Sequence, residues 1–259
     1  MQIDKKIAAV VTGGVSGLGE SVVRALAACG ARVSILDINA DSGPALAEEL
    51  GATFVRVDVS SDDSVEEGFA AARAANGQER ILVNCAGTAV AQKTAFRNRE
   101  TGEAGFHDMT TFSRILSINL LGTFRCSAMA AAGMLSLDAI GDEVGCIVQT
   151  SSIAAEDGQI GQTAYAASKA GIAGLTLPMA RDLSRDRIRV NTILPGIFRT
   201  PLVEANPPEV NASLAAQIPH PSRLGQPEEF ASLVLEVCRN AYLNGATLRL
   251  DAGIRMPPR

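Results

Sequence analysis

A tyrosine and a lysine four residues apart, Tyr165 and Lys169, are the pair in this sequence best suited to acid/base chemistry. They lie in a segment, residues 163–184, whose pattern predicts a helix, so both side chains should face the same cleft. A phenol with a pKa near 10 is a poor base at neutral pH. A nearby ammonium favours the phenolate, so we expect Lys169, together with a positively charged nicotinamide ring, to lower the pKa of Tyr165. Tyr165 would then exchange a proton with an alcohol or a carbonyl oxygen.

Two more polar residues fit such a reaction. Ser152 stands 13 residues before Tyr165, just beyond a predicted strand, where its hydroxyl could hold a substrate oxygen against the phenol. Asn119 is an amide inside an otherwise apolar helical stretch. The alternative for Asn119 is a helix residue that bonds to local backbone.

A glycine-rich loop, Gly13-x-x-x-Gly17-x-Gly19, separates the first predicted strand from the first predicted helix. Glycines let the chain turn sharply and let a pyrophosphate approach the main chain and the helix N-terminus. A purely structural turn would have the same composition. The position after the first strand of an alternating pattern favours a dinucleotide site.

Asp37 closes the second predicted strand, where a carboxylate can accept hydrogen bonds from the adenosine ribose and would repel a 2′-phosphate. No lysine or arginine lies in the glycine loop or directly after Asp37, so NAD(H) is favoured over NADP(H). The alternative is an ordinary aspartate in a turn. Asp58 and Val59 follow the third strand and should lie near the adenine. The small residues of segment 84–87 follow the fourth strand and leave room for a cofactor.

Short apolar runs alternate with helical patterns along the whole chain. Strands are predicted at 7–12, 32–37, 53–57, 80–84, 145–150, 189–194 and 247–251. Helices are predicted at 17–29, 42–50, 61–76, 111–135, 163–184 and 227–239. This alternation predicts an α/β protein: a single-domain Rossmann fold over residues 1–259, with a doubly wound, seven-stranded parallel sheet and helices on both faces. Two excursions, about 88–110 and 195–223, interrupt it; the second should hold short helical pieces.

Composition narrows the class of protein. The net charge is −5 with no basic stripe, so no nucleic-acid partner is expected. The five cysteines are scattered, which favours a reducing compartment and argues against a disulfide framework or a metal site. With no leader pattern and no long apolar run, we expect a cytoplasmic protein without membrane contact. His107 and His220 are interpreted as surface or loop residues.

Taken together and in this order, residues 12–19, residues 84–87, Asn119, Ser152 and the Tyr165–Lys169 pair resemble the short-chain dehydrogenase/reductase family. The resemblance covers essentially the whole chain. It implies a catalytic tetrad of Ser152, Tyr165, Lys169 and Asn119, in which the asparagine helps a water-mediated proton relay through the lysine. Pro195 and Gly196, followed by Thr200, are similar to the family's segment beside the nicotinamide.

Further segments resemble one branch of that family, the 3-hydroxyacyl-CoA dehydrogenases. They include Gly-Gln-Thr-Ala-Tyr-Ala-Ala-Ser-Lys around Tyr165 and Leu-Thr-Leu-Pro-Met-Ala-Arg-Asp-Leu after it. The tail departs from the usual pattern, because Asp251-Ala-Gly-Ile stands where Asp-Gly-Ala-Ile is common. The expected cofactor-binding residues, from the loops and the resemblance together, are Gly13, Ser16, Gly17, Leu18, Gly19, Asp37, Asp58, Val59, Cys85, Ala86, Gly87, Tyr165, Lys169, Pro195, Gly196, Phe198 and Thr200.

The resemblance implies reversible NAD-linked oxidation of a 3-hydroxyacyl-CoA to a 3-ketoacyl-CoA in fatty acid metabolism, with hydride passing to the nicotinamide and the proton to Tyr165. It also implies a homotetramer. The alternatives are an alcohol or hydroxysteroid dehydrogenase on the same scaffold, and a dinucleotide-binding scaffold without turnover. Candidate basic residues for the phosphates of coenzyme A are Lys93, Arg97, Arg99, Arg199 and Arg223, unless they are solvated surface charges. Small residues at 126–134 and 164–174 suit contacts between subunits, or close packing on the chain's own sheet.

Overall fold

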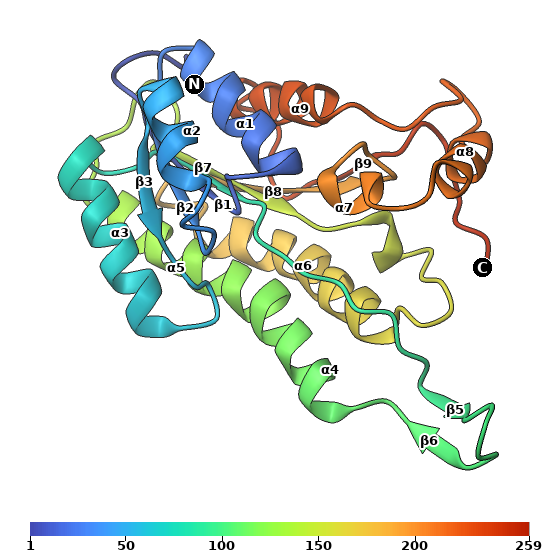
Figure 1. The fold of residues 1–259 in the computed structure, drawn as a ribbon. Coiled ribbons are helices and arrows are strands. Elements are labelled where there is room, and N and C mark those ends of the chain that lie inside the picture. Colours follow the sequence, from blue (N-terminus) through green and yellow to red (C-terminus); the bar gives the residue numbers. More distant parts are fainter. Residues whose placement is uncertain (259) are drawn as a thin grey trace.

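The structure, a computed structural model, describes residues 1–258 and is built on one seven-stranded sheet in the order β3-β2-β1-β4-β7-β8-β9 (Figure 1). The strands are β1 (Ala8–Thr12), β2 (Arg32–Asp37), β3 (Thr53–Arg56), β4 (Ile81–Asn84), β7 (Gly145–Thr150), β8 (Ile188–Pro195) and β9 (Thr247–Leu250). Every neighbouring pair is parallel. The predicted doubly wound α/β fold is therefore confirmed.

Helices cover both faces of the sheet (Figure 1). On one face lie α1 (Gly17–Ala28), α2 (Gly43–Leu50) and α9 (Pro227–Arg239); on the other lie α3 (Asp62–Asn76), α5 (Gly122–Met134) and α6 (Thr163–Asp182). Side chains alternate along each strand. Val11 and Ile35 therefore belong to the apolar core under α1, α2 and α9, whereas Val10 and Leu36 belong to the core under α3, α5 and α6. Strands buried on both faces read as continuous apolar runs.

The chain order reverses between β1 and β4, and this is where the glycine loop lies. Gly13 has φ +65°, and a Cβ on it would come within 2.6 Å of the Ala86 nitrogen. Only glycine therefore lets the loop after β1 pack against the turn after β4. A switch point of this kind opens a crevice at the carboxyl ends of the strands.

The helix predicted at 111–135 is interrupted. It consists of α4 (Met109–Leu116), a π-helical turn at Ser117–Leu121, and α5. A π turn inserts an extra residue into the helical repeat and commonly marks a functional position. By length and mean hydropathy (1.3) the stretch Met109–Met134 could cross a membrane, but core helices meet the same criterion, and this one packs against α3, α6 and the sheet. The absence of membrane contact stays a prediction.

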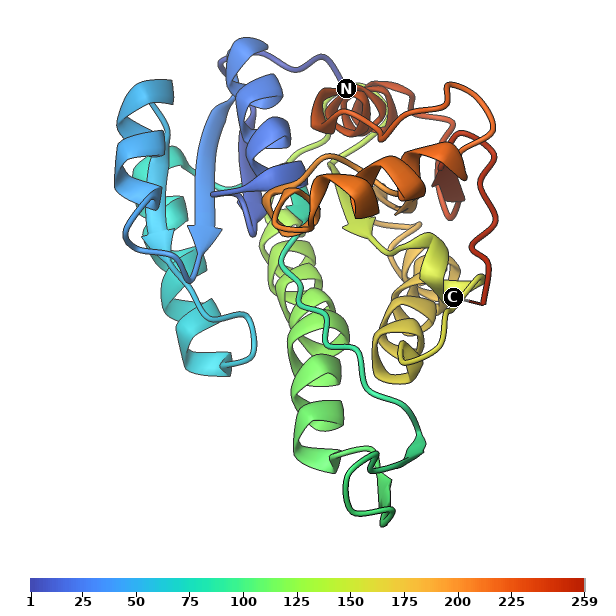
Figure 2. The same ribbon diagram turned by 45° about the vertical axis from the view of Figure 1, so that its right-hand side comes forward.

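The first excursion contains a hairpin that was not predicted. Strands β5 (Ala95–Arg97) and β6 (Ala104–Phe106) pair antiparallel and project from the body of the molecule (Figures 1 and 2). The ring of Phe96 lies over Gly105, where a Cβ would approach it to 2.7 Å. The second excursion holds α7 (Pro201–Glu204) and α8 (Pro208–Ala216), the short helical pieces that were expected.

His107 lies in the loop between β6 and α4, as one part of its interpretation as a surface or loop residue expects, but it is not a surface residue. Its side chain is buried, with Nδ1 2.9 Å from the Asp108 carbonyl oxygen and the ring edge-on to Phe112 at 5.5 Å. The chain returns from the hairpin at this point, where the His107 nitrogen donates to the Thr94 carbonyl at 3.0 Å. His220 is exposed, as expected.

Candidate active site

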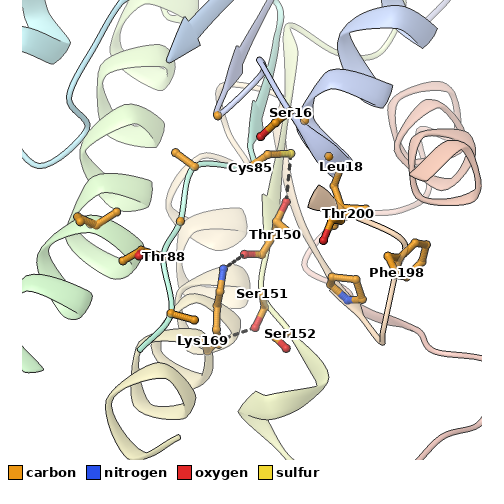
Figure 3. Close-up of a pocket in the computed structure, with 18 of the residues that line it drawn as sticks. Ser16, Leu18, Cys85, Thr88, Thr150, Ser151, Ser152, Lys169, Phe198 and Thr200 are labelled. Atoms are coloured by element: carbon orange, nitrogen blue, oxygen red, sulfur yellow. Dashed lines mark hydrogen bonds between the residues drawn. The ribbon is translucent and has the colours of Figure 1, made fainter. Parts of the chain in front are cut away.

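A cavity of about 690 Å³ lies at the carboxyl ends of the central strands, at the switch point (Figure 3). It runs from the glycine loop and the end of β2 to the start of α6. The structure places every predicted site residue on its wall except Asn119, which lies beneath it. The predicted residues on the wall are Gly13, Ser16, Gly17, Leu18, Gly19, Asp37, Asp58, Val59, Cys85, Ala86, Gly87, Ser152, Tyr165, Lys169, Pro195, Gly196, Phe198 and Thr200.

Main-chain contacts between α6 and the end of β7 hold Lys169. Its Nζ donates to the carbonyl oxygen of Thr150 at 2.9 Å, and the hydroxyl of Ser151 donates to the Lys169 carbonyl at 2.7 Å (Figure 3). The side chain is almost fully buried. Burial penalises the ammonium and lowers the pKa of Lys169 to about 8. The amine therefore exchanges its proton far nearer neutrality than an exposed lysine does.

Tyr165 lies one helical turn before Lys169, whose Nζ is 5.8 Å from the centre of the phenol ring. Burial raises the pKa of Tyr165, and a hydrogen bond with the Ser152 hydroxyl opposes that rise. The expected lowering of this pKa is thus not produced by the chain's own groups, because desolvation of the phenolate is the largest effect. Tyr165 and Ser152, the two residues predicted to meet a substrate oxygen, nevertheless line the same cavity.

Asn119 is fully buried in the π turn, and neighbours within the chain satisfy its amide. Its Oδ1 accepts from the Thr88 nitrogen at 2.8 Å, while Nδ2 donates to the Thr88 carbonyl and to the Ser168 hydroxyl, both at 2.9 Å. The side chain thus fixes the first residue of the excursion after β4 against α6. The backbone it binds is distant in sequence, unlike the local bonding considered from the sequence.

The cofactor end of the cavity suits a dinucleotide. Ser16 is the N-cap residue of α1 but its side chain makes no capping bond, which leaves the hydroxyl and the first amides of the helix available. The positive end of the helix dipole and such free donors favour a diphosphate. Gly17 has φ +55°, and a Cβ on Gly19 would lie 2.0 Å from the Gly13 carbonyl oxygen, so the loop closes only with glycine at these positions.

Two carboxylates, Asp37 and Asp58, line the end of the cavity that is farthest from Tyr165. Asp37 accepts from the Val15 nitrogen and from the Asn39 nitrogen, each at 3.0 Å, which ties the end of β2 to the glycine loop. A carboxylate has about four acceptor positions, so Asp37 can still bind two hydroxyls. Asp58 accepts from the hydroxyl of Ser60 at 2.7 Å, and hydrogen bonds from Ser60 lower the pKa of Asp58.

Five further residues line the cavity around Ser152 and Tyr165, where a substrate would bind, and the sequence did not predict them. Ile153, Ala154, Gln162, Val203 and Met256 line the cavity there. Ile153 and Ala154 form a short 3₁₀ helix directly after Ser152. Proximity to Ser152 and Tyr165 could have indicated Ile153 and Gln162. No pattern indicates Met256, because only the placement of β9 at the sheet edge carries that segment to the site.

The five basic candidates differ in their surroundings. Arg223 forms a two-bond ion pair with Glu229 (2.7 Å), Arg199 lies 3.9 Å from Glu204, and Arg97 donates to a carbonyl of its own hairpin. Among residues 1–258, Lys93 and Arg99 form no ion pair and both are exposed. Lys93 lies nearer the site, because the nitrogen of Gln92 donates to Gly161 at 2.8 Å and Thr94 contacts Thr163. Gly161 and Thr163 lie four and two residues before Tyr165.

The fold and this arrangement of serine, tyrosine and lysine beside a glycine loop define a short-chain dehydrogenase. The model of the short chain dehydrogenase family matches residues 7–211, and the chain belongs to that family. The family implies a nicotinamide dinucleotide, NAD or NADP, as cofactor. The residues described above fit such a group.

Individual members of the family are similar to this chain over nearly its whole length. The chain is 45% identical to 3-hydroxyacyl-CoA dehydrogenase type-2 of Homo sapiens over 98% of this chain and 97% of the human protein. It is 36% identical to cis-4-hydroxycyclohexanecarboxylate dehydrogenase of Sinomonas cyclohexanicum over 95% of both chains. The crystal structure of 3-hydroxyacyl-CoA dehydrogenase type-2 from Mycobacterium avium superposes with a TM-score of 0.92, at 42% identity over the whole of both chains.

Proposed function

We propose that the protein catalyses the reversible, NAD-linked oxidation of a 3-hydroxyacyl-CoA to a 3-ketoacyl-CoA. The observation that carries the proposal is that Tyr165, Ser152 and the buried Lys169 line one cavity, with the Lys169 Nζ 5.8 Å from the centre of the phenol ring and Asp37 at the other end. The full-length similarity to 3-hydroxyacyl-CoA dehydrogenases supports the substrate class.

The chain's own residues handle the proton and the substrate oxygen. In oxidation the phenolate of Tyr165 takes the alcohol proton, and in reduction the phenol returns it to the carbonyl oxygen. The Ser152 hydroxyl holds that oxygen beside the phenol. Lys169, with a pKa of about 8, provides a positive charge beside the ring and a proton close to neutral pH. The bound nicotinamide supplies the hydride acceptor or donor.

The preference for NAD over NADP rests on Asp37. Its carboxylate has room for the two ribose hydroxyls, and its charge disfavours a 2′-phosphate. Its bonds to the nitrogens of Val15 and Asn39 fix its position relative to the glycine loop. Lys93 is exposed and forms no ion pair among residues 1–258, and its neighbour Gln92 binds Gly161 shortly before α6, which supports Lys93 as the partner of a coenzyme A phosphate.

The test is NADH oxidation, followed by absorbance, with acetoacetyl-CoA, beside NADPH and beside a Tyr165→Phe variant. The proposal requires oxidation of NADH that the variant loses while it still binds NADH. If the wild type binds NADH but leaves acetoacetyl-CoA unchanged, the substrate assignment is wrong. Cyclic alcohols are then the first substrates to test, because one relative is a cis-4-hydroxycyclohexanecarboxylate dehydrogenase. Hydroxysteroids and a search for partner proteins follow.

The homotetramer, the cytoplasmic location and the role in fatty acid metabolism stay predictions. Of the small-residue stretch in α5, Cys126, Ala130 and Ala131 pack into the chain's own core, which is the alternative considered from the sequence. Leu121 and Phe124 are exposed near the start of the same helix. Light scattering on the purified protein decides the subunit number.

A further inference from the structure

Residues 251–258, here called the strap, run beside the loop of residues 153–162 that joins β7 to α6 (Figure 2). The nitrogen of Ile160 donates to the carbonyl of Pro258 at 3.0 Å, and the side chain of Gln159 donates to the carbonyl of Pro257 at 3.0 Å. This loop leads from Ser152 to Tyr165. The strap therefore braces the segment between two residues of the proposed chemistry.

Arg249, at the end of β9, ties the strap and the loop together. Its guanidinium pairs with Glu156 and with Asp157 (2.7 Å) in the loop, and with Asp251 (2.7 Å) at the start of the strap. It also donates to the Ile254 carbonyl at 3.2 Å. The arginine side chain is only 17% exposed, so these contacts are partly shielded from water. Planar, multiply bonded guanidinium contacts fix geometry as well as charge.

Met256 is the strap residue that reaches the cavity wall. It packs against the apolar cluster of Ile153, Ile218, Leu224 and Ile254, and Ile153 lines the cavity beside it. A flexible, unbranched thioether is well suited to close an irregular apolar space. Met256 lines the same cavity as Ser152 and Tyr165, so a group that extends from the reacting carbon of a substrate can meet it there.

We propose that Met256 is a specificity-determining residue that limits the size of the group carried by the reacting carbon, and that Arg249 is a positioning residue that holds Met256 and the 153–162 loop in place. The inference rests on the proposed function for the identity of that group, an acyl chain. No step of the chemistry passes through either residue.

The first experiment compares Met256→Ala with wild type on acetoacetyl-CoA and on a 3-ketoacyl-CoA two carbons longer. Removing three heavy atoms makes room for about two to three methylenes, each worth about tenfold or more in discrimination in a well-formed pocket. We expect the ratio of kcat/KM, long over short, to rise at least tenfold. Met129→Ala is the control, because Met129 is also partly buried but lies outside the cavity, and its ratio should not change. Equal ratios in all three proteins refute the assignment of Met256.

The second experiment follows hydrogen exchange of the loop in Arg249→Ala, Arg249→Lys and Arg255→Ala. Arg255 makes one ion pair with Asp251 and is largely exposed, so it serves as the matched control. In Arg249→Ala we expect faster exchange at Ile160 and a changed size ratio, that is, kcat/KM for the longer substrate over that for the shorter one. Arg249→Lys should recover part of both wild-type values, and Arg255→Ala should behave like the wild type. A uniform loss of activity with an unchanged ratio, or unchanged exchange at Ile160, overturns the positioning role.

The two proposals fail in distinguishable ways. A wild type that reduces ketones of another class, but no 3-ketoacyl-CoA, refutes the proposed function. The size ratio is then measured with a small and a large ketone of that other class, and the exchange experiment needs no substrate at all. A wild type that reduces 3-ketoacyl-CoA with a ratio insensitive to Met256→Ala refutes only the present inference.

Discussion

Replacing Asp37 with asparagine should change which dinucleotide the protein prefers. The carboxylate already accepts one hydrogen bond from Val15 and one from Asn39. Asparagine keeps one acceptor oxygen and nearly the same shape but loses the charge. The variant should therefore keep one of these two backbone contacts, with its amide oxygen, and lose the charge that selects NAD.

The size of the change follows from two effects. Weakening charge-assisted bonds to the ribose costs about 1.5 kcal/mol, roughly tenfold in NADH affinity. A 2′-phosphate carries about two negative charges, and each repels Asp37 by about 1 kcal/mol at 4 Å in water, so removing the charge gains about 2 kcal/mol for NADPH. The preference for NADH over NADPH should thus fall by about 3.5 kcal/mol, or roughly 300-fold.

The assay is titration of each dinucleotide by its own fluorescence, which tryptophan does not obscure because the chain has none. Asp41→Asn is the control, since it removes the same charge four residues further along, at an exposed side chain outside the cavity. If Asp37→Asn changes the NADH/NADPH affinity ratio by less than threefold while remaining folded, Asp37 does not select the cofactor. Equal ratio changes in both variants would point to long-range charge instead.

Three further predictions concern other parts of the chain. Lys93→Gln should raise KM for acetoacetyl-CoA several-fold, but not for the N-acetylcysteamine thioester, which lacks the phosphates, while Arg99→Gln at the hairpin tip changes neither. Ala252 has φ +52°, so Ala252→Gly should relieve about 1 kcal/mol of strain and raise Tm by about 2–4 °C, whereas the same change at the exposed helical Ala128 should lower it. The pKa of Lys169 is about 8 in the folded protein against 10.5 when exposed, so the unfolded chain binds more protons between these pH values. The unfolding free energy should therefore rise with pH across that window, relative to Lys169→Met, in denaturant titrations, and a parallel pH dependence of the two proteins would refute the shift.

The strands and most helices follow from the sequence because each carries a local signal. The parallel strands are buried on both faces, so runs such as residues 7–11 are apolar throughout, and Gly13 marks where that strand ends. The π turn at Ser117–Leu121 has no such signal. Its apolar periodicity continues that of the flanking helices, whereas the partners of Asn119 in this turn, Thr88 and Ser168, are distant in sequence and give no local signal.

The hairpin and the strap were missed for a related reason. The pairing of β5 with β6 depends on Phe96 lying over Gly105, a contact that a polar, irregular composition conceals. Met256 reaches the cavity only because β9 adds to the sheet edge and Arg249 turns the chain back along the 153–162 loop. The unusual order Asp251-Ala-Gly was visible in the sequence, and the positive φ of Ala252 is its structural consequence.

The side chains of the site depend mainly on backbone partners from neighbouring segments. Lys169 binds the Thr150 carbonyl, Ser151 binds the Lys169 carbonyl, and Asn119 binds both main-chain groups of Thr88. Backbone groups are present whatever the residue type, so these contacts are fixed by where β7, α6 and the π turn lie rather than by which side chains surround them. A substitution that shifts α6 along β7 should therefore disturb the geometry of the site more than one that changes a lining side chain and keeps the helix in place.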